Sequence, residues 1–261
     1  MKNVPFTQPT LPEIDKILPH LKKIIKSRML SNFSTYAQKF EDYISTYVRN
    51  PYVRVVSSAD IGLIIALKAL DAPEGGEVIL PSFTFASTAN AVIWNRLKPV
   101  FVDVDKNTFN IYPANIARAL TKNTVAIMPV HVFGNPCDID KIKVIAGSVP
   151  VVYDASQAFG TDYKGKKVGS FGTMEVFSFS GTKLVTSAEG GAITTTEQGL
   201  SERIKYIRGY GFYGDYNCRM VGINGKISEL NAMLGVLTSV NIDKFIKRRN
   251  LKHRFLFVFK N

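Results

Sequence analysis

The sequence predicts an α/β fold with a largely parallel sheet that helices cover on both faces. Two observations support this prediction. Short runs rich in β-branched residues alternate with stretches of helical pattern along most of the 261 residues, and 46% hydrophobic with 21% charged residues is the composition of an ordinary globular domain. Ligands bind to such sheets at the carboxyl ends of the strands, so functional residues are expected there.

One amphipathic helix is predicted before the sheet begins. It starts at Ser34 with Thr35 and Gln38 as a capping pair, and apolar or aromatic side chains follow at helical spacing. Strands are then expected at residues 53–57, 77–81, 99–104, 124–129 and 149–154, with helices near 60–70, 84–96, 113–120 and 138–146. Two further strands, 174–180 and 190–196, bring the predicted sheet to about seven strands.

Residues 241–261 differ in pattern from the rest of the chain. They begin as a basic helix and end with five apolar residues and a Lys-Asn stop, which is not the pattern of a complete domain. We therefore expect residues 1–240 to form one domain, and residues 241–261 to begin a smaller C-terminal domain that is largely missing.

The net charge of +12 is concentrated near the C-terminus, where residues 241–261 hold seven basic residues and one acidic residue, Asp243. Elsewhere the basic residues are spread without aromatic interleaving or a recognisable nucleic-acid module, so a solvated surface explains them better than nucleic-acid binding. An anionic small substrate would also suit this charge. Contact of the basic tail with an anionic membrane is a weaker interpretation.

No part of the sequence has the apolar length of a membrane span, and the first residues lack the apolar core of a signal peptide. Cys137 and Cys218 offer neither a metal-ligand spacing nor a disulfide framework. The sequence therefore predicts a cytoplasmic protein without a metal site.

The run FSFSGTKLVTSAEGG places Lys183 among small and hydroxyl residues before a Glu-Gly-Gly turn, which suits a covalently held aldehyde cofactor. Pyridoxal phosphate needs a lysine for its Schiff base, a carboxylate at its ring nitrogen and donors around its phosphate. Asp154 closes the strand at 149–154, so its carboxylate should point into the crevice at the strand end, although an Asp there could equally cap the next helix. Together the two residues favour a cofactor site.

Weaker candidates lie at other strand ends. Ser178 could hold the phosphate, as could the amides at the start of the helix in SSADIGL. Phe85 could stack on a flat cofactor ring, although a phenylalanine buried in the core is the commoner finding. For His131, packing beneath the cofactor is favoured over proton transfer.

Eight sequence blocks, taken in order, resemble one known family. The blocks are SSADIGL, EVILPSFTFAST, KPVFVDVDKNTFNI, AIMPVHVFGNPCDID, VVYDASQAFGTDYKGKKVGSFGT, FSFSGTK, AEGGAITT and GINGKISELNAMLG. In this order they are similar to the DegT/StrS-type nucleotide-sugar aminotransferases over about residues 1–250. The resemblance implies the aspartate-aminotransferase fold, called fold type I, with a seven-stranded large domain, and a homodimer that uses pyridoxal phosphate.

The resemblance also implies roles for individual residues. Lys183 would carry the cofactor as a Schiff base, and Asp154 would pair with the ring nitrogen. The other implied contacts are Gln157 beside the ring hydroxyl, Ser178 with the amides of Ala59 and Asp60 at the phosphate, Phe85 stacked on the ring, and Asn224 reaching the partner subunit's cofactor.

Two positions and the length depart from the family pattern. Asp60 stands where threonine is usual, and a carboxylate beside a phosphate dianion is unfavourable unless it turns away or is paired. Lys226 stands where arginine is commoner. The family usually continues through residues that complete the small domain, whereas the match here decays near Arg249.

The implied reaction moves an amino group from an amino acid, glutamate, to the keto group of a nucleotide-linked deoxysugar in polysaccharide or lipopolysaccharide amino-sugar biosynthesis. Lys183 favours transamination, because a related dehydratase branch has histidine at this place. The alternative is a catalytically inactive homologue that acts as a partner subunit or is the product of a disrupted gene.

Overall fold

The computed structural model of the protein describes the backbone of residues 8–258 and the side chains as far as Lys252. The helices are α1 Ile14–Ser27, α2 Thr35–Val48, α3 Ala59–Ala69, α4 Ala86–Trp94, α5 Pro113–Ala119, the 3-10 turn η1 Val132–Gly134, α6 Ile139–Ala146, α7 Gln198–Ile207, α8 Glu229–Ser239 and α9 Ile242–Val258. The strands are β1 Tyr52–Val56, β2 Glu77–Pro81, β3 Lys98–Val102, β4 Thr124–Ile127, β5 Val152–Asp154, β6 Asp162–Tyr163, β7 Lys166–Lys167, β8 Met174–Ser178 and β9 Gly191–Thr195. Each of the seven predicted strands and each predicted helix is present.

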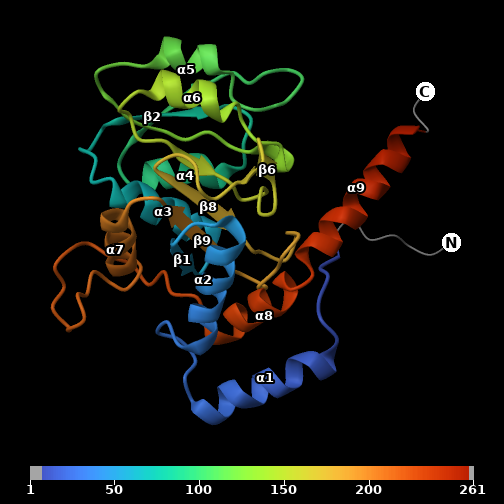
Figure 1. The fold of residues 1–261 in the computed structure, drawn as a ribbon. Coiled ribbons are helices and arrows are strands. Elements are labelled where there is room, and N and C mark those ends of the chain that lie inside the picture. The colour runs from blue at the N-terminus through green and yellow to red at the C-terminus, as the bar shows by residue number, and fades with distance from the viewer. Residues whose placement is uncertain (1–7, 259–261) are drawn as a thin grey trace.

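The predicted single sheet of seven strands is not confirmed in that form. Four strands pair in the order β1-β9-β8-β5 and three in the order β3-β2-β4, and only isolated parallel bridges, Ile127 with Val151 and Val130 with Asp154, connect β4 to β5. Pro129 and Pro150 lie beside these bridges, and because proline has no backbone N–H, a continuous ladder cannot form there. Figure 1 shows the two sheets adjoining within one α/β body.

The strands run mostly in one direction. Pairings β5–β8, β2–β3 and β2–β4 are parallel, and β9 is antiparallel to both β1 and β8. Strands β1 and β8 therefore point the same way, and β9 alone is reversed in the four-stranded sheet. As a result, the carboxyl ends of six strands, β1, β2, β3, β4, β5 and β8, lie along one edge.

Successive side chains along a strand point to opposite faces of the sheet and pack into different hydrophobic cores. Val55 and Phe177 pack with α2 and α8 on one face of the sheet, whereas Val56 and Val176 pack with α3, α4 and α7 on the other. A third core lies where α5 and α6 cover β2, β4 and β5. Both faces of the sheet are thus buried, as the sequence predicts for a parallel sheet between helices.

The predicted Thr35–Gln38 capping pair at the start of α2 is wrong. No side chain from the N-cap residue bonds to the first turn, and Gln38 donates to a backbone carbonyl that precedes the helix. The amides of Tyr36 and Ala37 instead donate to the buried carboxylate of Glu229, at 2.7 and 2.9 Å. Since Glu229 opens α8, the first turn of α2 is capped from a distant part of the chain.

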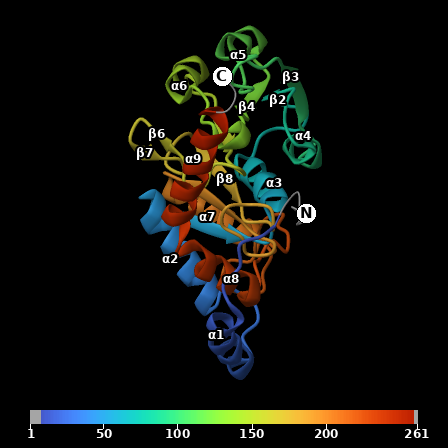
Figure 2. The same ribbon diagram turned by 90° about the vertical axis from the view of Figure 1, so that its right-hand side faces the viewer.

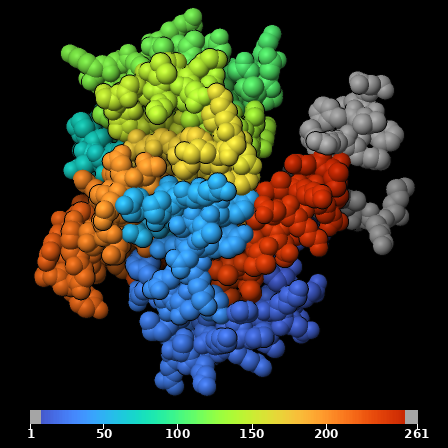
Figure 3. Space-filling model, viewed as in Figure 1, coloured from blue at the N-terminus to red at the C-terminus, as the bar shows by residue number. Residues whose placement is uncertain are grey.

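Helices α1 and α9 lie at the outside of the molecule. Figures 1 and 2 show α9 leaving the end of α8 and rising along one side, and Figure 3 shows both helices outside the central body. Within residues 8–258, no helix combines the length and the apolar character that a membrane span requires. The division into a domain of residues 1–240 and a second beginning at 241 stays a prediction.

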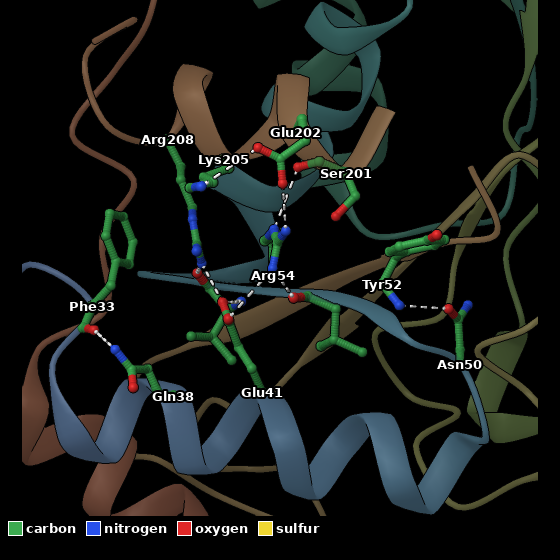
Figure 4. Close-up of polar contacts among 12 residues, drawn as sticks. Phe33, Gln38, Glu41, Asn50, Tyr52, Arg54, Ser201, Glu202, Lys205 and Arg208 are labelled. Atoms are coloured by element: carbon green, nitrogen blue, oxygen red, sulfur yellow. Dashed lines mark hydrogen bonds and ion pairs between the residues drawn. The ribbon is translucent and has the colours of Figure 1, made fainter. Parts of the chain in front are cut away.

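A buried ion pair takes the place of a further strand beside β1, which is an edge strand. Glu41 of α2 accepts a hydrogen bond from the amide of Val55 at 3.0 Å and one from Arg208 at 2.6 Å, while Arg208 donates to the Val55 carbonyl. Arg54 approaches the same carboxylate at 3.7 Å, and the Phe33 ring lies 4.0 Å from the Arg208 guanidinium carbon. Figure 4 shows Glu41 between the two arginines. The pair satisfies polar groups that an edge strand would otherwise leave open.

Replacing Glu41 with alanine is expected to lower the free energy of unfolding by about 3–5 kcal/mol, because the Arg208 guanidinium, 2% exposed, would lose its counter-ion. Urea unfolding measures the change. The control is Glu74→Ala, which removes a surface pair with Arg96 and should cost less than about 1 kcal/mol. Equal costs for the two variants would contradict a structural role for the buried pair.

His131 and Glu175 form a second buried polar pair. The Nδ1 atom of His131 accepts from the Cys137 amide at 3.1 Å, its ring stacks on Tyr153, and its Nε2 atom lies 3.9 Å from the Glu175 carboxylate. Burial lowers the pKa of His131 from 6.5 to about 3 and raises the pKa of Glu175 from 4.5 to about 8. At neutral pH the Glu175 carboxyl is therefore protonated and the His131 ring is neutral, so the pair holds one titratable proton.

These pKa shifts predict an optimum in stability. Between pH 4.5 and 6.5 the folded and unfolded states both hold one proton, so the pair adds no pH dependence. From pH 6.5 to 8 only the folded state holds the Glu175 proton, so the free energy of unfolding falls as pH rises, by about 1.4 kcal/mol per unit. Below 4.5 the unfolded chain gains the extra proton, and stability falls with decreasing pH.

Urea unfolding between pH 5 and 8.5 checks this expectation. Glu175→Gln removes the titrating carboxyl and should flatten the decline above pH 6.5, whatever its effect on absolute stability. Glu197→Gln changes an exposed carboxylate and should leave the profile of the original protein in place. A decline that survives Glu175→Gln would assign the pH dependence to other groups.

Candidate active site

A cavity of about 620 Å³ lies where the carboxyl ends of the strands meet. Its walls come from the segments that follow β1, β2, β5 and β8 and from the chain around η1. Seven of the eight predicted cofactor residues line it, namely Ala59, Asp60, Phe85, Asp154, Gln157, Ser178 and Lys183. The strand ends thus bring most of the candidate residues together around one cavity, as the sequence predicts for their placement.

Asp154 is the buried carboxylate of this cavity. It ends β5, is 4% exposed, and accepts from the Thr88 hydroxyl at 2.7 Å and from the Ser156 amide at 3.1 Å. The Thr84 and Thr88 hydroxyls are also 2.7 Å apart. Because the single Thr88 proton is directed to the carboxylate, Thr84 must donate to Thr88. This chain of hydroxyls orients Asp154 and offsets part of the cost of its burial.

Within the part of the chain that the structure describes, Lys183 is the one basic side chain in the cavity wall. It follows β8 in a turn closed by its own amide, which donates to the Ser180 carbonyl at 3.0 Å. The chain then returns, and the Ser187 amide bonds to the Phe179 carbonyl at 2.8 Å. These contacts hold a half-buried amine in the same cavity as the Asp154 carboxylate.

The first turn of α3 forms another part of the wall. Ser58 caps this helix by accepting from the Ile61 amide at 3.2 Å, which leaves the first amides, at Ala59 and Asp60, without an acceptor inside the helix. Gly191 of β9 packs against this turn, since a Cβ atom there would lie 2.8 Å from the Ala59 nitrogen. An anion at this helix N-terminus would be favoured by the amides and the helix dipole.

Aromatic rings stand at the mouth of the cavity. Phe85, just before α4, is 77% exposed, so the alternative of a buried core residue does not hold. Phe133 lies in the left-handed region with φ of 55°, and its amide donates to the Gln157 Oε1 atom at 2.6 Å. Gln157 thus fixes the rim through its Oε1 atom, and its Nε2 group, a donor, takes no part in this bond.

Three residues that the sequence analysis singled out, Asn224, Lys226 and His131, lie elsewhere. Asn224 is exposed, pairs with Gly209 in an isolated antiparallel bridge, and does not line the cavity. Lys226 donates to Asn32 at 2.6 Å rather than entering the site. His131 is fully buried and contributes no surface to the cavity, so packing, not proton transfer, is its observed role.

Sequence reasoning missed several polar groups in and behind the cavity wall. They are Thr84, Thr88, Ser180, Thr182 and Glu189. The available signal was that hydroxyl residues, Thr84 and Thr88, stand on either side of the start of α4. Nothing local in the sequence indicated that Thr88 meets Asp154.

The site has the groups that pyridoxal phosphate requires. An amine, a buried carboxylate, an exposed aromatic ring, and a helix N-terminus with hydroxyls nearby all line one cavity. The donor set therefore fits that cofactor.

Replacing Thr88 with valine, which has nearly the same shape, is expected to lower the free energy of unfolding by about 1–3 kcal/mol, because the buried Asp154 carboxylate loses a donor. Thr84→Val keeps that bond and should cost less. Urea unfolding of both variants measures the difference. A larger cost for Thr84→Val would contradict the donor direction deduced above.

The family model described as the DegT/DnrJ/EryC1/StrS aminotransferase family matches residues 13–256 of this chain. Among curated relatives, the chain is 36% identical over 255 residues to a dTDP-4-amino-4,6-dideoxy-D-glucose transaminase from Escherichia coli. That match covers 96% of this chain and 68% of the relative.

Two solved structures are also similar. DesI, determined in the presence of its TDP-sugar product, is 32% identical with a TM-score of 0.89, and the match covers 95% of this chain and 63% of DesI. A GDP-4-keto-6-deoxymannose-3-dehydratase with a trapped PLP-glutamate geminal diamine is 25% identical with a TM-score of 0.91, covering 99% and 74%. The chain thus spans about two thirds of the length of these proteins.

Proposed function

Because this chain belongs to the DegT/DnrJ/EryC1/StrS aminotransferase family, we propose that it moves an amino group from an amino acid, glutamate, to the keto group of a nucleotide-linked deoxysugar. The observation that carries the proposal is that the Lys183 amine and the buried Asp154 carboxylate line one cavity. Amino-sugar products of this kind would serve polysaccharide or lipopolysaccharide synthesis.

Pyridoxal phosphate is the family's cofactor, and when bound it supplies an electron sink for a carbon beside an amine. We assign Lys183 to its aldehyde carbon and Asp154 to its ring nitrogen. The remaining assignments are the Gln157 Nε2 donor at the ring hydroxyl, Ser178 with the Ala59 and Asp60 amides at the phosphate, and Phe85 on the ring face.

The side chains of the cavity then have distinct tasks. Lys183 Nζ is the one amine in the wall, so it is the group that takes a proton from a substrate carbon and returns it. Asp154, held by Thr88 and the Ser156 amide, keeps its negative charge directed into the cavity. The rings of Phe85 and Phe133 shield the site from water at its mouth.

Asp60 bears directly on the phosphate end of the site. Its carboxylate is exposed at the first turn of α3, lines the cavity, and makes no hydrogen bond or ion pair within the described residues. Its charge would weaken phosphate binding there, whereas the two amides of the same turn favour it.

The lysine at position 183 favours transamination over dehydration. The similar Escherichia coli protein is named a transaminase, whereas one similar solved structure is named a 3-dehydratase. Lysine at position 183 fits the first activity, because the family resemblance assigns histidine to the dehydratase branch. An inactive partner subunit is the less favoured alternative, since the amine and the carboxylate are both in place.

The site is proposed to be completed by a second copy of the chain. Asn224 is exposed and does not line the cavity of its own chain. This placement suits the expected role of reaching the partner subunit's cofactor in a homodimer. Within one chain, its loop is tied to the fold through the bridge between Asn224 and Gly209.

Absorbance spectroscopy with added pyridoxal phosphate tests the proposal. The protein should show a Schiff-base band that excess glutamate bleaches, and Lys183→Ala should lack the band and lose at least about 100-fold in turnover. Lys166→Ala, a change of an exposed lysine in β7, serves as the control and should leave both unchanged. A glutamate-sensitive band that persists in Lys183→Ala would refute the assignment.

A further inference from the structure

The first half of α9 is anchored against the loop that carries Gln157. Ile242 and Ile246 join the core beneath α2, and Asp243 accepts a hydrogen bond from Tyr47 at 3.0 Å. Gly160, at φ of 97°, allows this contact, since a Cβ atom there would lie 2.7 Å from Ile246. The helix is therefore fixed at its start even though it rises outside the body (Figures 1 and 2).

Arg249 lies on the inward face of α9. Positions 242, 246 and 249 follow the spacing of one helical face, so the arginine continues the row begun by Ile242 and Ile246. Lys247 and Arg248 belong to other faces. The row brings the Arg249 side chain to a chamber of about 300 Å³ beside the main cavity.

The chamber shares Lys183, Gln157, Ser178 and further residues with the main cavity. The side chains that line the two spaces nevertheless have net charges of opposite sign. Among the residues whose side chains are described, two basic ones, Lys183 and Arg249, and no acidic one line the chamber. The main cavity has one basic side chain and three acidic ones, Asp60, Asp154 and Glu189. An anion entering the site is therefore favoured in the chamber over the main cavity.

We propose that this chamber binds the carboxylate of the amino-acid donor, with Arg249 as the cation that receives it. The inference rests on the proposed aminotransferase function. An α-amino acid carries its carboxylate on the same carbon as its amine, so an amine presented at Lys183 brings the carboxylate into the chamber that Lys183 also lines. The planar guanidinium of arginine matches a carboxylate with two parallel hydrogen bonds.

The size of the chamber favours the small donor over the nucleotide sugar. Ligand pockets span about 300–1,000 Å³, and the chamber is at the lower limit of that range. The main cavity, about twice as large, suits the cofactor and the sugar. A diphosphate is also an anion, so binding of a nucleotide at Arg249 is the competing outcome that the experiment must separate.

The test compares Arg249→Met and Arg249→Lys with Arg248→Met, a neighbour on another face of α9. Single-turnover bleaching of the cofactor band is followed against glutamate concentration. Arg249→Met should raise the half-saturating glutamate concentration about 10- to 100-fold without altering the band itself, and Arg249→Lys should recover part of the loss. Arg248→Met should match the original protein.

Direct binding separates this inference from the proposed function. Calorimetric titration measures the affinity for maleate, a dicarboxylate that cannot react. This affinity should fall about tenfold or more in Arg249→Met alone. The affinities for dTDP and GDP should stay constant. If maleate binding depends on Arg249 but no variant shows a glutamate-sensitive band, the chamber assignment holds and the aminotransferase proposal fails. Unchanged maleate and glutamate dependence, or a loss confined to the nucleotides, would overturn the chamber assignment.

Discussion

The open edge of β1 is the constraint on which the rest of the structure depends. Strand β1 has a partner on one side only, and on the other side Glu41 and Arg208 bond to the amide and carbonyl of Val55. A charged pair costs free energy to bury, but here each member also satisfies backbone groups and the other member. The pair joins α2, β1 and the end of α7, so it sets how two faces of the domain meet.

That edge leads directly to the candidate site. One residue beyond β1, the Ser57 amide donates to the Gly225 carbonyl at 2.9 Å, and the Gly225 amide donates to the Arg208 carbonyl at 3.0 Å. The backbone of Arg208 therefore holds the loop that bears Asn224, and that loop in turn holds the turn that starts α3. Because β1, β5 and β8 run in the same direction, the groups that follow them meet along one edge.

Charge divides the site into two regions. Carboxylates line the larger cavity, where Asp154 would face a cationic ring, and basic groups line the smaller chamber, where an anionic donor would fit. Lys183 lies in the walls of both regions, so one amine can serve the cofactor and the substrate. The contact of α9 with Gly160 links this division to a helix at the end of the domain.

The sequence by itself determined the seven strands of the two larger sheets, most of the helices and the group of side chains at the strand ends. These follow from local periodicity and from the common direction of parallel strands. Only the tertiary structure decided which partners those groups have. Thr88 meets Asp154 across 66 residues, and Glu229 caps α2 across 193. The division of the sheet and the approach of Arg249 to Lys183 were likewise not predicted. Such contacts depend on how distant segments pack, and a local pattern contains no information about the partner's position.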